Sequence, residues 1–189
     1  MKRAITKDEV NELEVGAYQG TIYVADDEKS AKEAIAMLQN ESLLGFDTET
    51  RPSFKKGEQY TPSLLQFAAS DFAVLFRIHE TGLPDGLLRI FQSEKIIKIG
   101  IAIERDLKEL KDIASFEESG FIDLNTMAPQ KGFENVGVRR LAAMVLGIRI
   151  SKRQQTSNWE ADQLKPAQIE YAATDAWVCR EIYLKIKDL

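Results

Sequence analysis

The chain has 189 residues, of which 44% are hydrophobic and 29% are charged, a balance typical of a soluble globular protein with one domain. The single cysteine, Cys179, and the single histidine, His79, exclude an internal disulfide and a zinc site built from cysteine and histidine. They also disfavour a Ser-His-Asp or Cys-His catalytic group, so carboxylates must carry most of the chemistry if the protein is an enzyme. The net charge of −5, taken alone, argues against a nucleic-acid partner.

Hydrophobic periodicity and turn residues predict an alternation of strands and helices after a polar N-terminal segment. Residues 1–20 lack periodicity and are expected to form a flexible, loosely held arm. The expected strands span residues 21–24, 43–47, 63–69, 72–78, 95–101 and 121–124. The expected helices span residues 29–39, 85–92, 103–113, 138–146 (ended by Gly147) and about 166–187 (begun by Pro166).

The order of these elements predicts an α/β fold. The second, third and fourth strands follow one another, and a tight connection at Ser70 and Asp71 indicates a hairpin within an antiparallel meander. The later strands alternate with helices, as in βα units. We therefore expect a mixed sheet of five or six strands with an antiparallel meander edge and helices on both faces, in a single domain over residues 21–189.

Two carboxylates follow the second expected strand. If the chain stays extended, Asp47 and Glu49 project from the same face, because side chains alternate along a strand. Two negative charges roughly 7 Å apart repel each other unless a cation lies between them. A solvated turn is the alternative interpretation of this pair.

The last expected helix carries a carboxylate on its apolar side. On a helical wheel, Tyr171, Asp175, Val178 and Ile182 fall within one narrow arc, so Asp175 should face the core. Tyr171 and Asp175 are separated by four residues and are therefore stacked neighbours. Because an unpaired buried charge is costly, Asp175 should either bind a metal ion or form a salt bridge with an arginine or lysine.

Asp106 lies on the flank of the core side of the helix expected at residues 103–113. Its position in the first turn also allows a simple favourable interaction with the helix dipole. Considered together, Asp47, Glu49, Asp106 and Asp175 form a set of hard oxygen ligands without histidine or cysteine. Such a set suits Mg²⁺ or Mn²⁺, and several converging acids suit two such ions.

Three segments resemble the exonuclease motifs of the DEDD superfamily, and specifically those of its tyrosine-bearing branch, which includes ribonuclease D and the exonuclease domain of the Werner syndrome protein. They are Gly45-Phe46-Asp47-Thr48-Glu49-Thr50, Gly100-Ile101-Ala102-Ile103-Glu104-Arg105-Asp106 and Tyr171-Ala172-Ala173-Thr174-Asp175-Ala176. Two further segments are most similar to Werner-type members, namely Pro62-Ser63-Leu64-Leu65-Gln66 and Ser157-Asn158-Trp159-Glu160. The resemblance covers the chain from about residue 20 to its end.

The resemblance implies a ribonuclease H-like fold and a hydrolase that removes single nucleotides in the 3′→5′ direction with two divalent metal ions, Mg²⁺ or Mn²⁺. It implies that Asp47, Glu49 and Asp175 hold the ion that binds the attacking water. Asp47 would bridge to the second ion, which Asp106 would reach through water. Tyr171 would hydrogen-bond the attacking water and orient it, since a phenol is a poor base.

The resemblance also assigns substrate contacts. The backbone near Thr48, together with Glu49, would recognise the free 3′ hydroxyl of the terminal nucleotide. The expected substrate is nucleic acid with a free 3′ end, DNA in preference to RNA, and the products are nucleoside 5′-monophosphates. A ribonuclease H-like endonuclease and a non-catalytic nucleic-acid-binding module on the same fold remain alternatives.

The basic residues of the chain are unevenly distributed. Residues 131–153 carry a net charge of +5, while the rest of the chain is acidic. Within this segment, Lys152 and Arg153 precede the last helix, where we expect them to bind the phosphate backbone rather than to form a solvated face. Lys55 and Lys56 follow the first motif and are expected either to do the same or to lie in a plain surface loop.

Nothing in the sequence indicates a membrane protein. The apolar run from Leu141 to Ile148 is far shorter than the roughly 20 residues that span a bilayer. The N-terminus lacks the apolar stretch of a secretory signal. We therefore expect a cytoplasmic protein.

Overall fold

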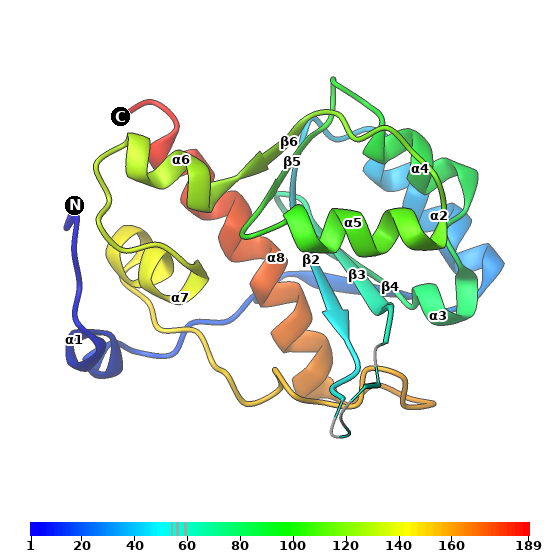
Figure 1. The fold of residues 1–189 in the computed structure, drawn as a ribbon, viewed down its shortest axis with the longest axis horizontal. Coiled ribbons are helices and arrows are strands. Elements are labelled where there is room, and N and C mark those ends of the chain that lie inside the picture. Colours follow the sequence, from blue (N-terminus) through cyan, green and yellow to red (C-terminus); the bar gives the residue numbers. More distant parts are fainter. Residues whose placement is uncertain (54, 56, 59) are drawn as a thin grey trace.

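The computed structural model describes residues 1–53, 55, 57–58 and 60–189. Its centre is a six-stranded mixed sheet with the strand order β1-β4-β3-β2-β5-β6 (Figure 1). The strands are β1 (Thr21–Ala25), β2 (Leu43–Thr50), β3 (Pro62–Ala68), β4 (Phe72–Phe76), β5 (Ile97–Gly100) and β6 (Phe121–Asp123). Each expected strand is present, and β2 continues three residues beyond its expected end.

The sheet combines antiparallel and parallel pairs. Strands β2, β3 and β4 form the expected antiparallel meander, and β5 and β6 extend the sheet in parallel on the other side of β2. The meander does not itself form an edge, because β1 pairs in parallel with the free side of β4. The mixed α/β sheet is otherwise as expected.

The helices include all five that the sequence predicts. They are α1 (Lys7–Glu12), α2 (Glu28–Leu38), α3 (Ile78–Thr81), α4 (Asp85–Phe91), α5 (Glu104–Ile113), α6 (Leu124–Gln130), α7 (Val138–Leu141), the π-helical η1 (Ala142–Leu146) and α8 (Pro166–Ile186). Gly147 adopts φ +70° and ends η1, as expected. Helices α1, α3 and α6 were not expected; α6 contains Pro129, which weakens a helical pattern.

Apolar side chains pack against both faces of the sheet, so that a layer of helices covers each face. On one face, Leu44 and Phe46 of β2 pack with Leu38 of α2, Phe91 of α4 and Leu110 of α5. The long helix α8 covers the opposite face and contacts strands β1 to β5, β2 most extensively (Figure 1). The alternation of side chains along β2 thus presents successive residues to α5 and to α8 in turn.

Gly45 allows α8 to lie directly against β2. A Cβ atom at this position would be 1.9 Å from the carbonyl oxygen of Ala176 and 3.3 Å from the Cβ of Arg180. Any other residue at position 45 would therefore push the helix away from the strand. This close approach determines the spacing between the carboxylates of β2 and that of α8.

The first 20 residues, expected as a loosely held arm, contain a helix and contact the rest of the fold. Ile5, Val10 and Tyr18 are each less than a tenth exposed. The backbone N–H of Ile5 donates to Oδ1 of Asn135 at 3.0 Å. These few apolar residues are too widely spaced to give a periodic signal, so only their tertiary contacts reveal them.

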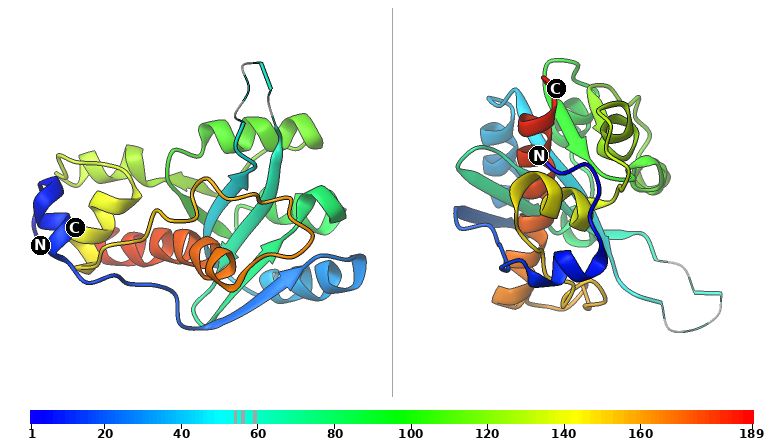
Figure 2. Two further views of the ribbon diagram at one scale, coloured as in Figure 1. Left: turned by 90° about the horizontal axis from the view of Figure 1, so that it is seen from below. Right: turned by 90° about the vertical axis from the view of Figure 1, so that its left-hand side faces the viewer.

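Both termini lie at the same end of the molecule (Figure 2). There Nζ of Lys131 donates to the backbone carbonyl of Leu189 at 2.8 Å.

Among the described residues, every helix is too short or too polar to cross a bilayer.

Candidate active site

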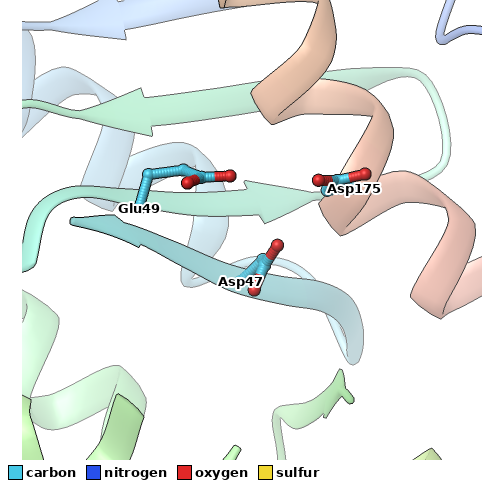
Figure 3. A group of neighbouring side chains, drawn as sticks. All are labelled: Asp47, Glu49 and Asp175. Carbon is cyan, nitrogen blue, oxygen red and sulfur yellow. The ribbon is translucent and has the colours of Figure 1, made fainter. Parts of the chain in front are cut away.

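Two carboxylates from β2 and one from α8 meet at one point. Gly45, Asp47 and Glu49 alternate onto the face of β2 that α8 covers. Asp175 of α8 is only 8% exposed and faces the same region. One carboxylate oxygen from each of Asp47, Glu49 and Asp175 lies within 4.8 Å of the others (Figure 3). The solvated-turn interpretation of the β2 pair therefore does not apply.

No salt bridge among the residues that the structure describes neutralises the buried Asp175 carboxylate. None of the ion pairs in the described part of the chain includes it. The Arg139 guanidinium is near enough to favour its charged form, although burial dominates and raises its pKa to about 7. Metal binding by Asp175 stays a prediction that this environment favours.

Tyr171 lies one turn before Asp175 on the same side of α8, and its interaction with Asp175 moderates the rise of the Asp175 pKa. The indole ring of Trp159 packs against the Tyr171 ring, with the centroids 6.0 Å apart. Because Trp159 is fully buried, it anchors the loop before α8 by packing and positions the Tyr171 ring.

Asp106 belongs to α5, which packs against the face of the sheet opposite to the one that α8 covers. Thr48, between the two carboxylates of β2, donates its hydroxyl proton to Oδ1 of Asp106 at 2.7 Å. Asp106 is not part of the group within 4.8 Å, yet its charge raises the pKa of both Asp47 and Glu49. Asp106 is therefore a fourth carboxylate that lies near Asp47, Glu49 and Asp175 but outside their cluster.

The four carboxyl groups resist carrying full negative charge together. Burial, reinforced by neighbouring carboxylates, raises the pKa of Asp47 well above its usual value and that of Glu49 to about 10. Burial also raises the pKa of Asp106 to about 6, against the hydrogen bond from Thr48. A site whose charge is this unfavourable is suited to a cation.

The donor atoms at this site fit divalent metal ions. They are carboxylate oxygens, which Mg²⁺ and Mn²⁺ prefer, and the cluster includes no histidine or cysteine. Gln66 lies directly opposite Asp47 in the pairing of β2 with β3, on the same face. Its side chain is fully buried, and within the described structure neither amide atom has a hydrogen-bond partner. Such unsatisfied groups suit the water molecules that accompany Mg²⁺.

A cavity lined with cations opens beside Tyr171 and Asp175. It has a volume of about 500 Å³, and Lys152 and Arg153 form part of its wall. Both side chains are exposed, and no ion pair among the described residues occupies them. The structure thus places the expected phosphate-binding residues next to the carboxylate cluster.

The sequence did not single out Arg139, Gln66 or Trp159 as neighbours of the site. Arg139 was only one of the basic residues of the segment 131–153, and its proximity to Asp175 follows from the packing of α7 against α8. Lys55 lies in a separate cavity with Arg51 and Tyr60, whereas Lys56 is outside the described residues.

Comparison with known proteins identifies the family. A family model described as "3'-5' exonuclease" matches residues 22–189. The chain belongs to the 3′-5′ exonuclease family. The resemblance to exonuclease motifs is therefore confirmed, and the matched region contains every residue of the carboxylate cluster.

Individual members of the family are distant relatives. A 3′-5′ exonuclease of Arabidopsis thaliana is 28% identical over 86% of this chain and 60% of its own length. The bifunctional 3′-5′ exonuclease/ATP-dependent helicase WRN of mouse is 30% identical over 100% of this chain but only 14% of its own length. A ribonuclease D of Gluconacetobacter diazotrophicus is 29% identical over 79% of this chain and 38% of its length. The chain thus spans less than two thirds of each of these relatives.

Solved structures confirm the ribonuclease H-like α/β fold. The EXO domain of Aedes aegypti Nibbler superposes with a TM-score of 0.83 at 22% identity, covering 92% of both chains. Ribonuclease D of Escherichia coli superposes with a TM-score of 0.80 at 19% identity, covering 90% of this chain and 45% of the other. At these identities the comparison establishes the fold of this exonuclease family member.

Proposed function

We propose that this protein is a divalent-metal-dependent 3′→5′ exonuclease that hydrolyses the terminal phosphodiester bond of nucleic acid and releases nucleoside 5′-monophosphates. The observation that carries the proposal is the convergence of Asp47, Glu49 and Asp175 within 4.8 Å, in a chain of the 3′-5′ exonuclease family. The adjoining cavity supports it, because its exposed cations suit a phosphate backbone.

In this proposal Asp47, Glu49 and Asp175 would hold one ion, and Asp47 and Asp106 would hold a second, Asp106 through water. When bound, two Mg²⁺ or Mn²⁺ ions lower the pKa of a water molecule and offset charge on the phosphate oxygens. The hydrogen bond from Thr48 keeps the Asp106 carboxylate oriented for this purpose.

Tyr171 positions the attacking water rather than deprotonating it. Burial and the neighbouring carboxylates raise the pKa of its phenol, so it stays protonated at neutral pH and serves as a hydrogen-bond partner. Glu49 and the backbone at Thr48 would bind the 3′ hydroxyl, and Lys152 and Arg153 would bind phosphates of the strand. Contact with a free 3′ hydroxyl would restrict cleavage to chain ends.

We propose DNA as the preferred substrate because the motifs around Gln66 and Trp159 are most similar to Werner-type members. The relatives do not decide between DNA and RNA, since they include both the helicase-linked WRN exonuclease and a ribonuclease D. One of the superposed structures is a complex of Trypanosoma brucei ribonuclease D with RNA. Matched DNA and RNA substrates must therefore be compared directly.

The test uses purified protein with 5′-labelled DNA and RNA oligonucleotides of the same sequence. With Mn²⁺ we expect a ladder of products shortened one nucleotide at a time, with DNA shortened faster than RNA. EDTA and a 3′-phosphate block should each abolish the reaction. Asp175→Asn should be inactive, whereas Asp188→Asn, which removes an 86%-exposed carboxylate, should be fully active.

Two outcomes would replace the proposal. Cleavage of a circular single-stranded substrate would indicate an endonuclease. Binding of oligonucleotide without any release of nucleotide in Mn²⁺ would indicate a non-catalytic binding module.

A further inference from the structure

The N-terminal segment precedes the region that the family model matches, yet it is attached to the active site. The backbone N–H of the buried Tyr18 donates to the hydroxyl of Thr174 at 3.0 Å, one residue before Asp175. Two backbone hydrogen bonds join the segment to Arg149, from Arg149 to the carbonyl of Glu14 at 2.9 Å and from Gly16 to the carbonyl of Arg149 at 3.0 Å. The N-terminal segment thus supports the start of the loop between η1 and α8 (residues 147–165), which carries Lys152 and Arg153.

Helix α1 is held in a defined position beside α7 (Figures 1 and 2). The Thr6 side chain accepts from the Glu9 backbone and the Glu9 side chain accepts from the Thr6 backbone, so the helix begins with a reciprocal cap. Val10 is 6% exposed and packs in the same cluster as Leu141 of α7. These contacts fix the orientation of α1 and therefore the direction in which Lys7 and Asn11 project.

A second cavity, of about 440 Å³, lies between α1, α7 and the loop between η1 and α8. Lys7 and Asn11 of α1 line one part of it, and Arg140 and Lys152 line another. At one end it reaches Asp175, so it is continuous with the candidate active site.

The cavity has an excess of positive charge. Four cations line it, namely Lys7, Arg139, Arg140 and Lys152, against the single carboxylate of Asp175. Across the described residues, no ion pair engages any of these four cations. Four clustered cations with a single carboxylate beside them repel one another, and an anionic ligand would relieve that repulsion.

We propose that this second cavity is a phosphate subsite that binds a phosphodiester of the nucleic-acid strand other than the one being cleaved, and that the N-terminal segment supplies Lys7 and Asn11 to it. The inference rests on the proposed function, because the strand must reach the carboxylates at the end of the cavity. It assigns a substrate-binding role to residues outside the matched exonuclease region. The N-terminal segment is then one wall of the nucleic-acid channel.

The experiment measures binding in the Asp175→Asn background, where hydrolysis does not interfere. A fluorescent single-stranded oligonucleotide is titrated with Lys7→Gln, Arg140→Gln and the control Lys29→Gln, and anisotropy gives Kd at several salt concentrations. Lys29 lies on α2, is 84% exposed at its side chain and carries the same charge as Lys7. We expect Lys7→Gln and Arg140→Gln each to weaken binding about threefold to tenfold, with the slope of log Kd against log salt reduced by about 0.7.

A structural role for α1 is distinguished by Lys7→Arg, which keeps the charge and should restore most of the affinity. Equal affinities and salt slopes for Lys7→Gln, Arg140→Gln and Lys29→Gln would overturn the proposal. So would a Lys7→Arg variant as weak as Lys7→Gln. Because no turnover is needed, an absence of nuclease activity would refute the proposed function without deciding this result.

Discussion

Replacing Asp175 with asparagine should abolish nuclease activity and, in the absence of metal, stabilise the protein. Asp175 is only 8% exposed and shares its site with Asp47 and Glu49. Asparagine has nearly the same shape but no charge. The substitution therefore removes the repulsion that Asp175 exerts on Asp47 and Glu49, together with one expected metal ligand.

The size of the effect follows from the Asp175 pKa, which burial raises from 3.8 to about 7. A carboxyl group with a raised pKa in the folded state stabilises the fold below its unfolded pKa, and this contribution is lost as the pH rises through the folded pKa. At about pH 8 the free energy of unfolding of the wild-type protein should thus be roughly 4 kcal/mol lower than at acidic pH, whereas that of the variant does not carry this loss. Burial of the carboxylate is the main cause of this loss, and the interactions with Tyr171 and Arg139 reduce it.

The assay is thermal unfolding in EDTA across a range of pH. We expect Asp175→Asn to raise the Tm by about 3 to 10 °C at pH near 8 and to change it little at pH near 4. Mn²⁺ should raise the Tm of the wild type more than that of the variant. Asp188→Asn, which removes an exposed carboxylate, is the control. An unchanged Tm in EDTA at the higher pH, or near-normal turnover, would refute the reasoning.

Three further substitutions test other parts of the structure. Tyr171→Phe should lower kcat by about 10- to 100-fold, less than Asp175→Asn, because it only disorients the water; a loss as large as that of Asp175→Asn would contradict an orienting role. Gly45→Ala should cost about 3 kcal/mol or more in urea unfolding and reduce activity, because its Cβ would lie 1.9 Å from the Ala176 carbonyl oxygen. Lys98→Met should cost about 3 kcal/mol in the same assay and leave kcat unchanged, because the buried ammonium donates to three backbone carbonyls remote from the carboxylates; unaltered stability would refute this.

Local pattern alone predicted much of the candidate site. The alternation of side chains placed Asp47 and Glu49 on one face because a strand has a period of two residues, and the structure extends β2 through both. The helical wheel placed Asp175 on the inward side of α8 because a helix has a period of 3.6 residues. These features depend on backbone geometry within a few residues, so the sequence is sufficient to reveal them.

Contacts between distant segments depended on the tertiary structure. The hydrogen bond from the Thr48 hydroxyl to Asp106 exists only because α5 packs against the sheet. That Gln66 is buried, with no hydrogen-bond partner among the described residues, was likewise not apparent from the sequence, because β3 is buried along its whole length, including its polar residues Ser63 and Gln66. The N-terminal segment was expected to be loose because it lacks periodicity, whereas its few apolar anchors act only when α7 and α8 are already in place.

By itself, then, the sequence determined the faces of β2 and α8 on which Asp47, Glu49 and Asp175 lie, and the order of the six strands and of the five helices that it predicted, because local backbone geometry sets all of these. The tertiary structure decided how near those faces approach one another, through the missing side chain of Gly45 beneath α8. It also decided which cations border the site, because residues separated by more than a hundred positions, such as Lys7 and Arg140, become neighbours only when the chain packs. Distances between elements arise from packing, which no local repeat encodes.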